Sequence, residues 1–159
     1  MIEAVRDELF EYMVESHRLL DLRYQRLLDA MVVGAPEVRE LWTQLDHELL
    51  AHMEGEERYV LPAFARFDRE EAVALLQDHG RVRVQLLELG VAVDLHALRY
   101  ERSLELVELL RAHGAREERV LYRWADRALD PSLTRAVFRH VQSPRLAPEK
   151  AEKAVAHAT

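Results

Sequence analysis

The stretch AHMEGEER at residues 51–58 returns almost unchanged as AHGAREER at residues 112–119. Each copy places a histidine four residues before a glutamate, as His52 and Glu56 in the first and His113 and Glu117 in the second. Residues four apart are neighbours on one face of an α-helix. Each copy is therefore predicted to present an imidazole and a carboxylate side by side, and two such pairs in one chain indicate a metal site.

The repetition extends beyond these two stretches. His79 follows His17 by 62 residues, and His113 follows His52 by 61. A repeat at this spacing indicates two similar helical hairpins. Each hairpin supplies a lone histidine on its first helix and a histidine-glutamate pair on its second.

The spacing of apolar residues predicts four long helices, over about residues 3–33, 36–67, 69–90 and 95–129. Asp68 is a suitable N-cap for the third helix, and Pro62 is expected to kink or end the second. Long helices joined by short connections predict an all-α, antiparallel up-down-up-down four-helix bundle. A short extra C-terminal helix is expected from residue 130. Residues 1–142 would form the bundle domain, and residues 143–159 a flexible tail.

The histidines and glutamates of the repeat lie on the apolar stripes of their helices, where a core would otherwise contain leucine. A buried carboxylate without a partner costs several kcal/mol, so two of them in one core require a shared cation. The predicted metal ligands are His17, His52, Glu56, His79, His113 and Glu117.

Other polar residues are predicted to play no part in binding the metal. Three glutamates lie off the stripes and are expected to face solvent, namely Glu54, Glu57 and Glu118. The remaining histidines are also not expected to bind the metal: His47 lies off its stripe, and His96, His140 and His157 lie at a helix start, in the short last helix and in the tail. The aromatic residues Tyr12, Tyr24, Tyr59, Tyr122 and Trp124 are expected to pack, with Tyr24 and Tyr59 as candidates for lining the site. Glu48, one turn before His52, is a candidate extra ligand.

Four imidazoles and two carboxylates form a nitrogen and oxygen donor set, and the chain contains no cysteine. Such a set suits iron or manganese better than copper(I), and it exceeds what one tetrahedral zinc needs. Two metals bridged by both carboxylates and by a solvent-derived oxo or hydroxo group would use all six residues. Each metal would keep an open position for O2 or another small diatomic molecule.

The sequence resembles the hemerythrin-like (HHE cation-binding) family in SHRLL with His17, AHMEGEERYVLP, DHGRVRVQLLEL with His79, and AHGAREERVLY. This resemblance implies a non-haem di-iron centre with bridging glutamates and terminal histidines. One departure concerns the fifth histidine of the oxygen-carrying members, which lies one turn from the third-helix histidine. Here the two positions one turn from His79 are Leu75 and Arg83.

Three functions remain open at this point. A binding or sensing module would take up O2 or report iron without turnover. A small di-iron redox enzyme would act on O2, peroxide or nitric oxide at the open positions. A structural metal would only hold the bundle together.

Composition narrows the expected partners and location. Acidic residues outnumber basic ones by 29 to 22, giving a net charge of −7, which argues against nucleic-acid binding. No apolar run approaches the roughly 20 residues of a membrane span, and the N-terminus lacks a signal-peptide pattern. We therefore expect a cytoplasmic protein without a membrane partner, and its protein partner is unknown.

Overall fold

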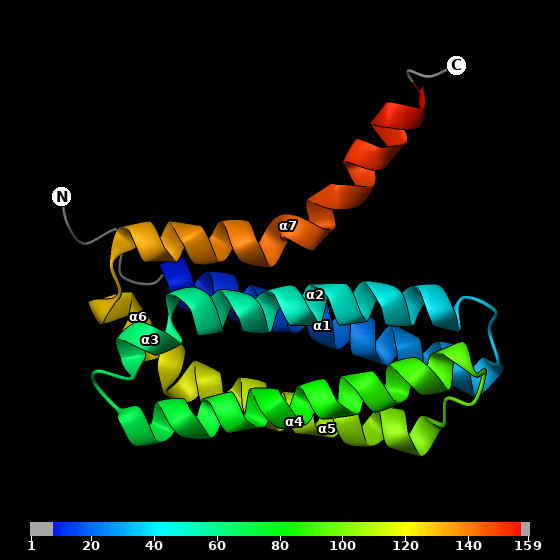
Figure 1. The fold of residues 1–159 in the computed structure, drawn as a ribbon, viewed down its shortest axis with the longest axis horizontal. Helices are drawn as coiled ribbons and strands as arrows, with labels where there is room; N and C mark the ends of the chain where they lie inside the picture. Colours follow the sequence, from blue (N-terminus) through cyan, green and yellow to red (C-terminus); the bar gives the residue numbers. More distant parts are fainter. Residues whose placement is uncertain (1–7, 157–159) are drawn as a thin grey trace.

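The computed structural model describes residues 8–156, with side chains described for residues 8–144. Four long helices form the bundle: α1 (Glu8–Val33), α2 (Val38–Tyr59), α4 (Arg69–Asp94) and α5 (Tyr100–Arg119). Two short helices, α3 (Leu61–Phe64) and α6 (Leu121–Ala128), lie together at one end. The first part of α7 (Pro131–Ala156) runs along the outside of α2, and the helix then turns away from the bundle (Figure 1). The predicted all-α bundle is confirmed.

Local sequence signals explain several of the helix ends. Gly34 ends α1 with a left-handed backbone (φ 64°), a conformation that glycine adopts without steric cost. The Asp68 carboxylate accepts a hydrogen bond from the backbone N–H of Glu71 and caps α4, as predicted. At the other end of α4, the helix continues past Gly90 to Asp94, so Gly90 does not end it. A Cβ atom at Gly90 would lie 3.7 Å from the Trp42 indole nitrogen, so this glycine lies at a packing contact.

Two breaks at one end of the bundle set the shape of the site. The first, at Val60, precedes Pro62 and was expected from that proline. The second, at Val120, has nearly the same backbone angles (φ −113°, ψ −62°) but no proline beside it. The sequence instead predicted one continuous helix over residues 95–129. The break at Val120 starts the short helix α6, which carries Tyr122.

Apolar side chains form two separate layers along the bundle axis. One layer, towards the connection between α1 and α2, includes Leu27, Leu45 and Leu89. The other, towards α3 and α6, includes Met13, Phe64 and Leu75. On α1 and α4 the predicted ligands fall between residues of the two layers, and on α2 and α5 they adjoin or follow the last residues of the first layer. The polar cluster is therefore enclosed by hydrophobic packing above and below.

The last helix is longer than the sequence indicated. A short helix from residue 130 was predicted, but α7 extends from Pro131 to Ala156. Residues 143–156, predicted to be part of a flexible tail, continue this helix, while residues 157–159 lie outside the described residues. The segment is rich in alanine, glutamate and lysine, which are strong helix formers, and this preference outweighs the cost of Pro144 and Pro148.

We predict that Gly55 controls how closely α7 approaches α2. A Cβ atom at Gly55 would lie 3.0 Å from Val141 Cγ2, whereas one at the exposed Gly80 would meet nothing within 4 Å. Gly55→Leu should lower the free energy of unfolding by about 1–3 kcal/mol through overpacking. The control Gly80→Ala should raise it by about 0.5–1 kcal/mol through helix propensity. Urea unfolding followed by circular dichroism measures both, and a stabilised Gly55→Leu would contradict this packing argument.

Candidate metal centre

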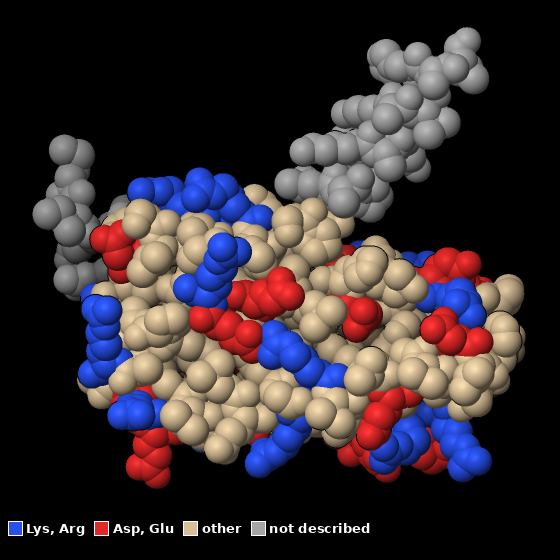
Figure 2. Space-filling model, viewed as in Figure 1, with Lys and Arg blue, Asp and Glu red and all other residues tan. Residues whose placement is uncertain are grey.

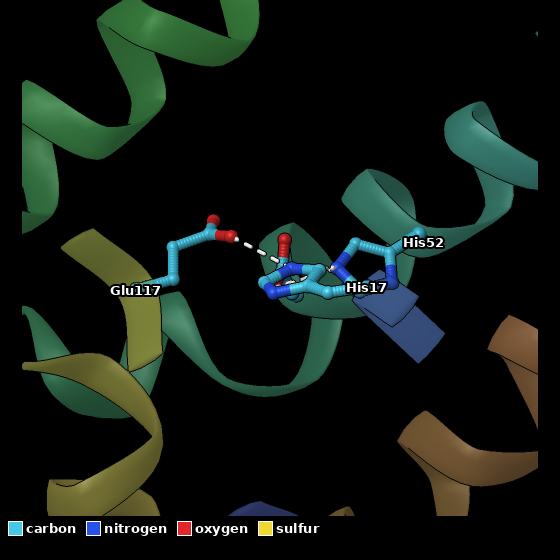
Figure 3. A group of neighbouring side chains, drawn as sticks. His17, His52 and Glu117 are labelled. Atoms are coloured by element: carbon cyan, nitrogen blue, oxygen red, sulfur yellow. Dashed lines mark hydrogen bonds and ion pairs between the residues drawn. The ribbon is translucent and has the colours of Figure 1, made fainter. Parts of the chain in front are cut away.

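All six predicted ligands meet at one level of the bundle. They form two groups, and within each group the potential ligand atoms lie within 4.8 Å of one another. The first group contains His17, His52, Glu56 and Glu117, and the second contains His79, His113 and Glu117. Figure 3 shows His17, His52 and Glu117 of the first group, contributed by α1, α2 and α5. The structure thus brings the residues together, and their binding of a metal stays a prediction.

The two carboxylates reach imidazoles of both groups. Glu117 Oε2 lies 3.3 Å from His17 Nε2, and Glu117 Oε1 lies 2.7 Å from His113 Nε2. Glu56 behaves similarly, with Oε1 3.3 Å from His52 Nε2 and Oε2 3.5 Å from His79 Nε2. Each carboxylate therefore presents one oxygen to each side, which is the arrangement that a carboxylate bridge between two cations requires.

Every histidine of the cluster turns its Nε2 atom inward and has a hydrogen-bond partner at Nδ1. His17 Nδ1 donates to Glu118 Oε1 at 2.9 Å, and His79 Nδ1 donates to Glu57 Oε1 at 2.8 Å. The other two partners are Ser16 Oγ, 2.9 Å from His52 Nδ1, and Asp78 Oδ2, 3.3 Å from His113 Nδ1. An acceptor at Nδ1 fixes the tautomer and the ring orientation, leaving Nε2 with a lone pair for a metal.

Two of these acceptors correct the sequence-based interpretation. Glu57 and Glu118 were expected to face solvent, but their side chains are only 25% and 34% exposed and accept hydrogen bonds from the predicted ligands His79 and His17. Both directly follow a predicted ligand glutamate in the repeated Glu-Glu-Arg. The signal available in the sequence was this second glutamate. It lies beside the apolar stripe of its helix, where its side chain can contact a residue of the adjacent helix. Glu54 meets the expectation more closely, since it lies at the surface and pairs with His140.

Arginines anchor the supporting acids from neighbouring helices. Arg83 makes two hydrogen bonds to Glu57, at 2.6 and 2.9 Å. Arg116 pairs in the same two-pronged way with Glu71 and also reaches Asp78. Such paired contacts fix the carboxylate orientation. Arg83 occupies one of the positions where the fifth histidine of the oxygen carriers would be sought, and here it supports His79 through Glu57.

Protons balance the buried charge when no cation does. Burial favours the neutral imidazole of His79, but hydrogen bonds to Glu117, Glu56 and Glu57 outweigh burial and raise the pKa of His79 to about 11. The pKa of His17 rises to about 9 for the same reasons. Burial would raise the pKa of Glu117, yet the charge of His113 beside it holds that pKa well below its usual range. The cluster thus favours ionised carboxylates together with positive charge.

Two buried atoms show that the residues fit a cation. Glu56 Oε2 and His113 Nε2 are buried and make no well-aligned hydrogen bond, although each lies near an oppositely charged group, His79 and Glu117 respectively. An unpaired buried polar atom normally costs about 1–3 kcal/mol. In addition, the Nε2 atoms of His17 and His52 lie 3.0 Å apart. Two imidazole nitrogens aimed at one region, together with unpaired carboxylate and imidazole atoms, form a donor set that a metal ion would satisfy.

Tyr122 is the residue that the sequence interpretation missed. It was expected to pack in the core, but its hydroxyl donates a hydrogen bond to Glu56 and lies 3.0 Å from His17 Nε2. Neither of the two tyrosines proposed to line the site, Tyr24 and Tyr59, has a hydrogen bond to a predicted ligand within the described residues. Glu48, the candidate extra ligand, belongs to neither group and pairs with Arg23.

The remaining histidines do not join the cluster. His47 and His96 are exposed, and His140 contacts Glu54 at the surface. His157 lies outside the described residues.

A groove of about 320 Å³ between α1 and α5 reaches the cluster from solvent. Its lining includes His17, Tyr24 and Gly114. His17 is the most exposed of the six, with 17% of its side chain accessible, while the other five are at most 5% accessible. A Cβ atom at Gly114 would lie 3.2 Å from two ring atoms of His17. The absence of a side chain at Gly114 therefore allows the His17 ring to lie against α5.

The outer surface carries charges of both signs. Acidic and basic side chains are interspersed over the face seen in Figure 2. Within residues 8–156, no helix combines the length and apolar character needed to cross a membrane.

Comparison with known proteins agrees with the geometry of the site. The family model described as hemerythrin HHE cation binding domain matches residues 8–125, which include all six clustered residues and Tyr122. No curated protein and no solved structure matches the chain. The family match covers well over half of the sequence and confirms the resemblance noted above. The chain belongs to the hemerythrin HHE cation-binding domain family.

Proposed function

We propose that this chain is a non-haem di-iron protein that binds O2 or a similar small diatomic molecule, or senses iron, at a carboxylate-bridged metal pair. One metal would be held by His17 and His52, the other by His79 and His113. Glu56 and Glu117 would connect them. The observation that carries the proposal is the common orientation of four imidazoles, each with Nε2 inward and Nδ1 bound to a fixed partner.

The chemistry of the donor set favours iron. Nitrogen and carboxylate oxygen donors without thiolate suit iron and manganese. Bound iron would supply a redox-active centre for small diatomic molecules, and the chain supplies the environment. Hydrophobic layers on both sides exclude water, and the groove beside His17 offers a short path from solvent. Manganese uses the same ligand types, so metal analysis of protein purified from cells distinguishes the two.

A small redox enzyme is the alternative, acting on O2, peroxide or nitric oxide. It is supported by the lack of a histidine at either position one turn from His79, which are occupied by Leu75 and Arg83. A site with fewer protein ligands leaves more positions for reaction. The two functions differ in whether the oxidised state returns to the starting state when the gas is removed.

Ligand substitutions should change metal content in steps. Anaerobically loaded wild-type protein should hold about two iron ions per chain, since the cluster forms two groups. Glu117→Gln should lose most of both, because Glu117 belongs to both groups, whereas His113→Ala should retain about one. His140→Ala is the matched control and should retain two. Iron is measured by elemental analysis after gel filtration, with circular dichroism to verify folding. Equal iron content in Glu117→Gln and wild type would contradict the proposal.

Adjacent glutamates provide a test of the supporting hydrogen bonds. Glu57→Ala removes the acceptor of His79 Nδ1, whereas Glu54→Ala removes a surface partner of His140. Metal affinity should fall about 10–100-fold in Glu57→Ala, the usual effect of losing such a partner. It should be unchanged in Glu54→Ala. Competition with a chromogenic chelator measures both affinities, and equal affinities would show that Glu57 does not support the site.

The gas reaction separates the candidate functions. Visible spectra of iron-loaded protein should be recorded before O2, after O2, and after degassing. A band that appears with O2 and disappears on degassing would support reversible binding. A permanent ferric spectrum would favour an iron sensor or redox enzyme, and catalytic consumption of peroxide or nitric oxide then identifies the enzyme. Iron that raises the melting temperature but leaves the spectrum insensitive to every gas would indicate a structural metal and overturn the proposal.

A further inference from the structure

The phenol of Tyr122 lies among the donor atoms of only one of the two groups. Its hydroxyl oxygen is 3.0 Å from His17 Nε2, 3.2 Å from His52 Nε2 and 3.3 Å from Glu117 Oε2. It also donates a hydrogen bond to Glu56 Oε1. These partners are the four members of the first group. Tyr122 has no hydrogen bond to His79 or His113 within the described residues.

Hydrogen bonding alone does not account for this arrangement. A phenol has one proton to donate, and both carboxylates can only accept when ionised. One proton thus faces two carboxylate acceptors, Glu56 and Glu117, in a site where the Tyr122 side chain is fully buried. A cation among these atoms would balance them, with the phenol oxygen as one more donor.

The chain holds Tyr122 in this position through the break in its helix. The break at Val120 starts α6, which contains Tyr122. The Asp126 carboxylate on α6 accepts hydrogen bonds from the backbone N–H groups of Leu9 and Phe10 and so ties α6 to the start of α1. The residue equivalent to Tyr122 in the first repeat is Leu61, five positions after Glu56. Only the second repeat therefore has a phenol at this position.

We propose that Tyr122 is a seventh protein ligand, binding through its phenol oxygen to the metal held by His17 and His52. The inference rests on the proposed metal pair and makes its two members different. On binding, the phenol O–H bond breaks, an oxygen–metal bond forms, and the proton passes to solvent without any change of oxidation state. The metal at His79 and His113 keeps fewer protein ligands, so the position open to small molecules lies on that side.

The test compares ferric protein from wild type, Tyr122→Phe and the control Tyr24→Phe. Tyr24 is also buried, but it has no hydrogen bond to the cluster within the described residues. Wild type should show a phenolate-to-iron absorption band in the visible range. Its resonance Raman spectrum should contain tyrosine ring vibrations that shift when the protein is made with ring-deuterated tyrosine. Tyr122→Phe should lose both signals, and Tyr24→Phe should keep them.

Metal binding provides a second measurement. Tyr122→Phe should still hold two metals, with the affinity of one site lowered at least tenfold and that of the other unchanged. Wild type with two iron ions and no tyrosine vibrations would overturn the role of Tyr122 and leave the di-iron proposal standing. Wild type that binds no iron would overturn both. The labelled wild-type spectrum needs no substitution, so the result does not depend on how Tyr122→Phe folds.

Discussion

Two buried carboxylates, Glu56 and Glu117, impose the constraint on which the rest of the site depends. Their side chains are 0% and 1% exposed, at the centre of a helical bundle. An ionised carboxylate in such an environment costs several kcal/mol unless positive charge and hydrogen bonds compensate. Four imidazoles supply that compensation, as proton carriers without a metal and as ligands with one. The apolar layers on either side keep water from doing the same.

The charged surface of the bundle has a role beyond solubility. Arg83 on α4 orients Glu57 on α2, which in turn holds His79 on α4. Arg116 on α5 similarly connects to Asp78, the partner of His113. Exposed ion pairs contribute little to stability when isolated. Here their consequence is positional, because each pair limits the rotation of an imidazole and links two helices at the level of the cluster.

Periodicity and repetition were enough to predict the bundle and to identify the six residues that meet. Each of these residues interrupts an apolar stripe, and a stripe depends only on local spacing. The supporting glutamates and Tyr122 were missed because their roles depend on which helix lies opposite, which one sequence does not specify. The break at Val120 was missed because it has no proline. The length of α7 was underestimated because its last part offers little to bury, whereas its strong helix formers are sufficient to continue the helix.

The two halves of the chain repeat one pattern, and the differences between them decide what the site can do. Identical halves would give two equivalent metals with equal access. Gly114 replaces the equivalent Met53, which allows His17 to lie against α5 beside a solvent groove. Tyr122 replaces Leu61, so a phenol lies on the same side. One side of the cluster therefore has the solvent groove and, in our proposal, an additional donor, while the His79 side stays enclosed and would have fewer protein ligands. If the proposed metal pair is present, such asymmetry would let one metal bind a small molecule while the other keeps its coordination.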